Sequence, residues 1–176
     1  MKKGFTLLET LVAISILLIA VVAPLSTIGG SLSSIFTARD QMIAVNFAQE
    51  GIEMVRQKRD SNMLNVWKNG VGSWGDNLSA GEYLIDATNL KGNGALLSCA
   101  TSCDVGDKKS IRQDQGTGLF YQTTSASPGE NTQFTRSVKI EDVSSVEKTV
   151  TSTVIWSVGG VTKKVEVKES MFGINS

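Results

Sequence analysis

The sequence predicts an α+β protein in which a long N-terminal helix packs on a small antiparallel sheet. Three observations lead to this prediction. A membrane-length apolar run over residues 5–30 opens the chain, and an amphipathic helical pattern follows it over residues 31–60. Strand-like alternation then fills the C-terminal third of the chain, within a head that spans residues 61–176. A helix laid on an antiparallel sheet is the layer arrangement of an α+β fold.

Composition argues against catalysis. Lysine plus arginine and aspartate plus glutamate both number 17, and histidine is absent from the 176 residues. The commonest general base and metal ligand is therefore missing. No phosphate loop, nucleotide fingerprint or nucleophile–base set occurs. Basic residues cluster only at Lys108, Lys109 and Arg112, which is too little for a nucleic-acid footprint. We expect no enzyme, catalytic residue, cofactor, metal or nucleic-acid partner.

The apolar run is long enough to span a bilayer. No charged side chain lies between Thr10 and Ala38, whereas a helix needs only about 20 apolar residues to cross. Lys2 and Lys3 precede the run, and basic residues stay on the cytoplasmic side. We therefore expect a single-pass protein with an extracytoplasmic head. Glu9 needs an explanation, because a carboxylate costs about 2.5–3.5 kcal/mol at the centre of a membrane helix.

Three interpretations of this N-terminus compete. A cleaved signal peptide needs small residues before the cut, and Pro24 directly after Ala23 disfavours cleavage there. A plain transmembrane anchor explains the hydrophobicity but not Glu9. The third interpretation takes the features together: the stretch KKGFTLLE, residues 2–9, resembles the prepilin signature of type IV pilins and type II secretion pseudopilins.

The resemblance implies a processing pathway and a set of partners. Prepilin peptidase, a membrane aspartyl protease, would remove residues 1–4 as a leader by cutting between Gly4 and Phe5 and would methylate the new amine of Phe5. Glu9 would then neutralise the terminal amine of a neighbouring subunit or of its own chain, as an assembly residue. The implied partners are other pilin or pseudopilin subunits, the inner-membrane assembly platform and, before assembly, membrane lipid. The implied location is the cell membrane and then a filament.

The helical region carries further signals. Pro24 removes a backbone hydrogen bond, so a kink or local opening is expected there. An apolar stripe then predicts one face that packs on the head. Gly51, in mid-helix, indicates either close packing of another backbone or a solvated face without a role. The pattern ends at Asp60-Ser61-Asn62. The stripe consists of Phe36, Ile43, Phe47 and Met54.

The first part of the head is predicted to be mostly loop. Residues 62–81 are turn-rich, with Trp67 and Trp74 as lids on the core, and residues 82–86 form a short strand. Residues 91–115 form a surface excursion.

Within this excursion, Cys99 and Cys103 favour a small loop-closing disulfide, with two free thiols as the alternative. Asp104, Asp107 and Asp114 do not have the spacing of an EF-hand loop.

The last third is predicted to be sheet. Alternation from Phe134 to Ile140, interrupted by Arg136, indicates one strand. Residues 149–156 and 161–168 alternate around Gly159-Gly160, which predicts a hairpin beside the first strand, and residues 119–122 add a further edge.

Two functions remain open. One is a structural subunit, which we expect to be a minor one, of a type IV pilus or a type II secretion-like pseudopilus. The alternative is a membrane-anchored extracytoplasmic binding module that does not polymerise.

Overall fold

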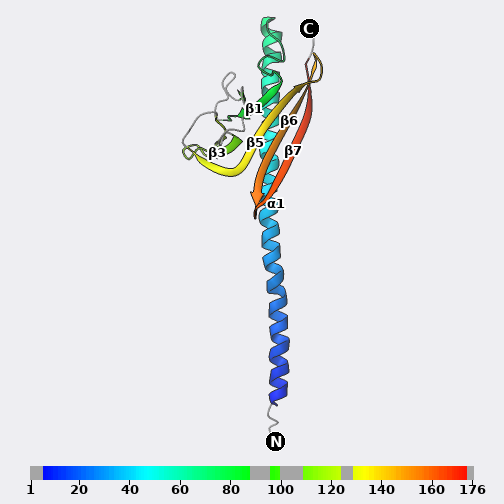
Figure 1. Ribbon diagram of the computed structural model, residues 1–176, viewed down its shortest axis with the longest axis vertical. Coiled ribbons are helices and arrows are strands. Elements are labelled where there is room, and N and C mark those ends of the chain that lie inside the picture. The colour runs from blue at the N-terminus through cyan, green and yellow to red at the C-terminus, as the bar shows by residue number, and fades with distance from the viewer. Residues whose placement is uncertain (1–5, 88–95, 100–108, 124–128, 174–176) are drawn as a thin grey trace. The chain divides into compact units, whose positions relative to one another are not determined.

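The computed structural model describes residues 6–87, 96–99, 109–123 and 129–173 of the chain (Figure 1). Helix α1, Leu7–Asn69, comes first. The chain divides into two compact units, unit 1 over Met1–Asp40 and unit 2 over Gln41–Ser176. No helix among the described residues meets the length and hydropathy that a membrane span requires. The strands that follow α1 are β1 (Gly81–Ile85), β2 (Leu96–Ser98), β3 (Ser110–Gln113), β4 (Phe120–Tyr121), β5 (Glu130–Asp142), β6 (Glu147–Val158) and β7 (Val161–Phe172).

Helix α1 ends later than the sequence predicts. The polar Asp60-Ser61-Asn62 stretch does not stop it, because Asn62 is buried and its side-chain amide donates to the carbonyls of Trp74 and Asp76, at 3.0 and 2.7 Å. The helix stops at Asn69 because Gly70 adopts a positive φ of 67° and its N–H donates to the Val66 carbonyl. This is the αL type of helix end, which glycine favours. A tertiary contact thus overrides the local polar signal.

The described strands form one curled antiparallel sheet, which confirms the α+β prediction (Figure 1). The hairpin of β6 and β7 pairs from Val158↔Val161 to Glu147↔Phe172, and its turn residues Gly159 and Gly160 have φ of 57° and 80°. Strand β5 pairs with β6 on one edge and with both β1 and β3 on the other. The hairpin, the third neighbouring strand and the edge near residues 119–122 are all confirmed.

The core of unit 2 consists of two apolar clusters between α1 and the sheet. Both clusters take helix residues from the face that carries Ala44, Ala48, Ile52 and Val55. The predicted stripe is only partly right. Phe47 is buried, Ile43 and Met54 pack at the rim, and Phe36 is 59% exposed. The first cluster adds Leu78, Tyr83, Ile85, Val138, Ile140, Val150 and Met171, and the second adds Phe47, Ile111, Phe134, Val154 and Trp156.

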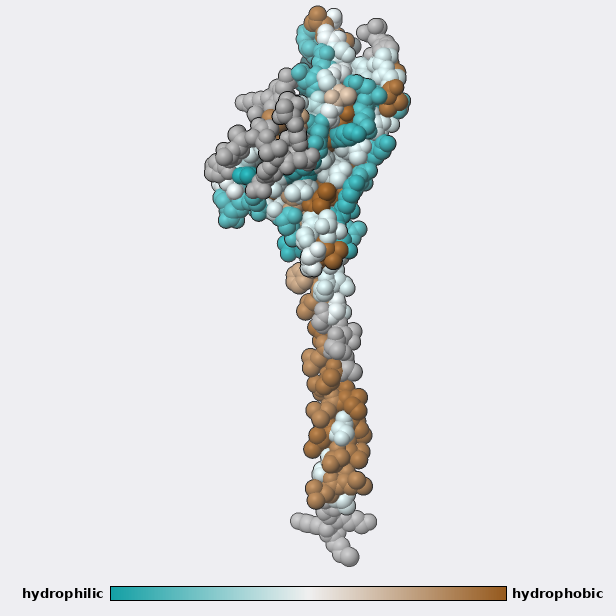
Figure 2. Space-filling view, in the orientation of Figure 1, coloured by the Kyte–Doolittle hydropathy of each residue, from teal (hydrophilic) through white to brown (hydrophobic). Residues whose placement is uncertain are grey.

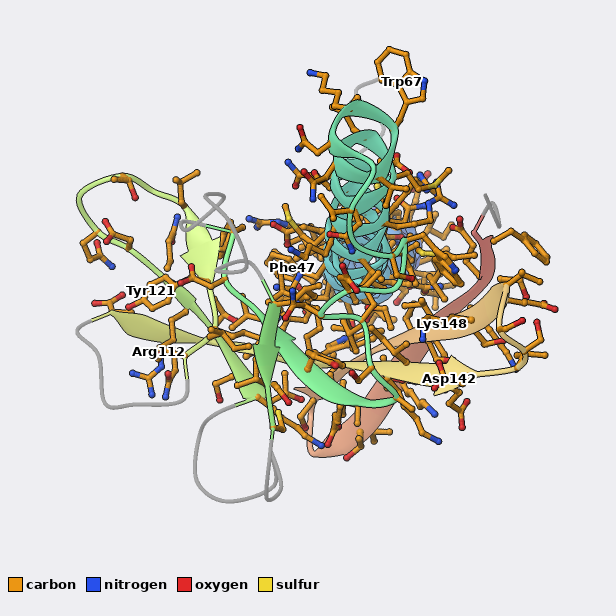
Figure 3. The ribbon with its side chains drawn as sticks, turned by 90° about the horizontal axis from the view of Figure 1, so that it is seen from above. Phe47, Trp67, Arg112, Tyr121, Asp142 and Lys148 are labelled. Atoms are coloured by element: carbon orange, nitrogen blue, oxygen red, sulfur yellow. The ribbon has the colours of Figure 1, made fainter. Side chains whose placement is uncertain are left out.

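Two predictions about the head need correction. Trp74 is a buried lid, with its ring against Gly173, but Trp67 is 81% exposed and projects from the end of α1 (Figure 3). The longer helix carries Trp67 beyond the sheet, so Trp67 does not cover the core.

The excursion over residues 91–115 contains the strands β2 and β3, and Ile111 in β3 is fully buried. Short strands among polar and glycine residues give too few alternating positions to detect.

Tyr83 provides a test of the core at high pH. Burial, reinforced by the charge of Asp142, raises the pKa of Tyr83 above its ordinary value of 10.0. The folded state therefore favours the neutral phenol, so this stability is complete below pH 10 and is lost as the pH rises through the folded pKa. Tyr83→Phe should lower stability at neutral pH, because the hydroxyl donates to the Ser79 carbonyl, but should flatten the alkaline decline. Urea unfolding at pH 8, 10 and 11 would measure this; parallel declines in both proteins would contradict it.

Candidate functional site

The first turn of α1 contains the predicted assembly residue. Thr6 caps the helix: its side-chain oxygen and its carbonyl both accept from the Glu9 N–H, at 3.3 and 3.0 Å. Thr6 and Glu9 therefore have the T-x-x-E spacing of a capping box. The positive end of the helix dipole also favours a carboxylate in this turn. The T-x-x-E pattern is legible in the sequence, so the helix start at Thr6 could have been predicted.

The described large apolar side chains of unit 1 are all exposed. Every described large aliphatic or aromatic side chain from Leu7 to Phe36 is between 48% and 90% exposed. Figure 2 shows these apolar residues in brown along the described part of unit 1. Soluble monomers rarely leave such a surface uncovered. The segment therefore requires an apolar environment, which lipid or other apolar helices can provide.

The remaining predicted N-terminal residues are only partly covered by the structure. Pro24 lies inside α1, which is helical on both sides of it, so the kink or opening at Pro24 stays a prediction. Gly4 and Phe5, the predicted cleavage and methylation residues, lie outside the described residues.

An ion pair between a buried arginine and a partly exposed glutamate fixes α1 to the sheet within unit 2. Arg136 on β5 is 1% exposed, and its Nη1 donates to Glu50 Oε2 of α1 at 2.6 Å and to the Phe47 carbonyl at 3.0 Å. Its Nη2 donates to the Ile85 carbonyl at 3.4 Å, and its Nε donates to Gln122 Oε1 at 3.0 Å. Burial lowers the pKa of Arg136, and the Glu50 carboxylate opposes that shift. The arginine that interrupts the apolar alternation of β5 is thus the centre of a network that the sequence did not reveal.

Gln122 completes this network. Its amide nitrogen donates to the carbonyls of Lys109 and Arg136, at 2.7 and 2.8 Å, and its oxygen accepts from the Ile85 N–H as well as from Arg136. Gln122 is fully buried. One side chain therefore joins β1, β5 and the residue before β3. Buried polar groups that are fully paired in this way specify one arrangement of the elements around them.

Gly51 lies on α1 where the helix packs closely against Ser152 of β6 and Val138 of β5. A Cβ at Gly51 would lie 2.5 Å from Ser152 Oγ and 3.0 Å from Val138 Cγ2. Close packing, one of the two roles open for this glycine, is therefore what the structure shows, although side chains and not a backbone approach it. Ser152 Oγ is buried and has no hydrogen-bond partner among the described residues. Arg136, Gln122 and Ser152 form a polar layer between the two apolar clusters.

The described head residues contain no metal site. No group of three or more cysteine or acidic side chains among them could hold an ion. Hydrogen bonds from Thr117, and then from the Gly116 N–H, lower the pKa of Asp114, whose Oδ1 accepts from both backbone N–H groups. Asp104 and Asp107 lie outside the described residues.

Cys99 is disulfide-bonded, whereas Cys103 lies outside the described residues. The Cys99–Cys103 pairing therefore stays a prediction.

Comparison with known proteins identifies the N-terminal segment. Residues 1–23 match the family model for the prokaryotic N-terminal methylation motif. No curated protein and no solved structure matches the chain. The motif points to a structural protein and suggests a membrane-anchored precursor. The chain therefore carries the N-terminal signature of type IV pilins and pseudopilins, and its α+β architecture is consistent with a pilin-like fold.

Proposed function

We propose that this chain is a minor structural subunit of a type IV pilus or of a type II secretion-like pseudopilus, and that it is not an enzyme. Prepilin peptidase cuts it after Gly4 and methylates Phe5. The precursor is held in the membrane through residues 5–30, with its leader in the cytoplasm and its head outside. Other pilin-type subunits and the inner-membrane assembly platform are its partners. The observation that supports this most is the methylation motif on a helix whose described large apolar side chains from Leu7 to Phe36 are all exposed.

In this proposal Glu9 sets the register of assembly. Its carboxylate neutralises the new amine of Phe5 on a neighbouring subunit or on its own chain, within an apolar packing of helices. Removing one member of a desolvated pair leaves the other charge buried, which costs about 3–5 kcal/mol. The capping geometry at Thr6 gives a competing explanation in which Glu9 only starts the helix. The test must therefore separate charge from capping.

We expect both Glu9→Ala and Glu9→Gln to abolish incorporation into filaments while membrane insertion and cleavage after Gly4 continue. Glutamine supports a capping box as well as glutamate does, but it has no charge. Thr6→Ser is the matched control, because it keeps the cap and should assemble normally. The measurement is the fraction of the chain in sheared or cross-linked filament material. Normal assembly of Glu9→Gln would reject the charge pairing, and normal assembly of both Glu9 variants would favour a membrane-anchored binding module.

Mass spectrometry of the mature chain tests the processing step directly. The expected N-terminus is Phe5, about 14 Da heavier than the unmodified chain because of one methyl group. A chain that retains Met1, or one cut near Ala23, would contradict the proposal.

A further inference from the structure

The last turn of α1 ends at an Asn-Gly step that lies open to solvent. Asn69 is the final residue of the helix, and Gly70 follows it with a positive φ of 67°. Both residues are exposed, as are their neighbours Trp67 and Lys68 (Figure 3). Among the described residues, nothing lies within 4 Å of the position that a Cβ would take at Gly70. No described group therefore shields the peptide bond between Asn69 and Gly70.

An asparagine that precedes a glycine can lose its own side-chain nitrogen. The backbone nitrogen of the glycine attacks the asparagine Cγ, so a new N–C bond forms, the Cγ–Nδ2 bond breaks and ammonia leaves. The resulting five-membered succinimide takes up one water molecule, which opens the ring to aspartate or isoaspartate. Glycine favours this reaction because it has no side chain to hinder the closing ring and its backbone is unusually free to rotate. Solvent water is the only co-reactant, and no group is oxidised or reduced.

The folded end of α1 holds both reacting groups in other contacts. The Gly70 N–H donates to the Val66 carbonyl at 2.8 Å, so the attacking nitrogen is engaged. The side-chain amide of Asn69 donates to Asn65 Oδ1, so the carboxamide under attack is held as well. Asn65 lies one turn back along the helix, on the side away from Gly70. The reaction therefore requires both hydrogen bonds to open.

These two hydrogen bonds lie where a helix opens most readily. Helix ends fray, and exposed backbone hydrogen bonds open at a small fraction of the free energy of global unfolding. The buried Asn62, which donates to the carbonyls of Trp74 and Asp76, fixes α1 about two turns earlier. Fraying of the last turn therefore leaves the Asn62 contacts and the core in place. The reactive conformation is reached without unfolding unit 2.

We propose that Asn69 is a site of slow, spontaneous deamidation, and that fraying of the last turn of α1 sets its rate. The product adds one acid to the 17 that balance 17 basic residues, so a neutral chain becomes acidic. The new carboxylate lies at the C-terminal end of a helix, where the helix dipole disfavours a negative charge. The exposed end that carries Trp67 therefore changes its charge and loosens as the molecule ages. This modification is independent of the proposed function.

Peptide mapping of the full-length chain in detergent tests the site. The folded protein is kept at neutral pH, sampled over several weeks and analysed by mass spectrometry with fragmentation, which assigns a gain of about 1 Da to one asparagine. Asn69 should convert about tenfold more slowly than in the chain unfolded in urea, because only the frayed fraction reacts. Asn69→Gln is the matched control and should remove the signal, since its longer side chain must close a larger ring. The second Asn-Gly step, Asn93-Gly94, lies outside the described residues and is measured separately in the same maps.

Two valine variants test the role of the helix end. Asn65→Val removes the acceptor of the Asn69 amide and keeps a similar helix propensity, so we expect conversion about twofold faster. Ser61→Val makes a similar change one turn earlier, at another exposed residue, and should leave the rate unchanged. Circular dichroism and urea unfolding would show that both variants keep the fold.

Two results would overturn the proposal. If Asn69 stays intact in the folded chain while it converts in urea, the last turn does not open and Asn69 is not a site of modification in the native protein. If Asn65→Val and Ser61→Val convert at the same rate, the hydrogen bond from Asn69 to Asn65 does not control the reaction. Conversion in the folded chain that rises in Asn65→Val alone supports both parts of the proposal.

Discussion

Arg136→Ala is expected to destabilise unit 2 by about 3–5 kcal/mol, because it empties a buried site and leaves buried acceptors without their donor. The loss has several sources. The carbonyls of Phe47 and Ile85 and the oxygen of Gln122 each lose a donor, and the missing side chain leaves a cavity between the two apolar clusters. Urea unfolding of the full-length chain in detergent, followed by tryptophan fluorescence, would measure the change. A loss below about 1 kcal/mol would contradict this account.

Two further variants separate charge from hydrogen bonding. Glu50→Gln keeps an acceptor for Arg136 and removes the charge, so we expect a smaller loss of about 1–3 kcal/mol. Arg136→Met with Glu50→Gln removes both charges together. Because the Glu50 change alone leaves the buried Arg136 charge without its ionic partner, the combined loss should fall below the sum of the single losses. Strict additivity would show that the two side chains act independently.

Gly51→Ala is the second change for which we expect a large effect. Alanine favours a helix over glycine by about 1 kcal/mol, but here its methyl group would lie 2.5 Å from Ser152 Oγ in a filled core. Overpacking of this kind costs about 1–3 kcal/mol. We therefore expect net destabilisation, and a greater loss for Gly51→Val. The same urea unfolding would measure both changes.

Ser152 supplies the control for this prediction. Ser152→Ala alone should be neutral or slightly stabilising, because it removes a buried hydroxyl that has no hydrogen-bond partner in the described structure. Combined with Gly51→Ala it should restore most of the lost stability, since the atom nearest the new methyl group is gone. If Gly51→Ala is just as destabilising without the Ser152 hydroxyl, the clash with Val138 Cγ2 is the larger cause.

Local patterns predicted the elements that local sequence controls. Apolar periodicity is enough to identify α1, and the Gly159-Gly160 turn between alternating residues is enough to identify the β6–β7 hairpin. The end of α1 and the exposure of Trp67 were predicted wrongly because Asn62 is stabilised by residues that lie 12 and 14 positions further along the chain. Polar residues favour a helix end only when no tertiary hydrogen bond satisfies their side chains.

The candidate site divides in the same way. Gly4, Phe5 and Glu9 form a contiguous motif with a fixed register, so one sequence is enough to propose their roles. Arg136 interrupts the apolar alternation of β5, so in the sequence it only weakens the strand pattern. Its partner Glu50 lies 86 residues away, too far for a local pattern to link the two. No local pattern reports such a pairing. Long-range electrostatic partners become visible only once the chain has folded.

These long separations have a consequence for the order of events during synthesis. The bonds from α1 to Arg136 and to Glu169 span 86 to 113 residues, so the buried face of α1 has no sheet to cover it until β5–β7 have been translated. Chains rich in such distant contacts fold slowly. Arrested nascent chains that stop before residue 130 should therefore expose Phe47 and Ile52 to protease or to chaperones, whereas chains extended past residue 173 should be protected.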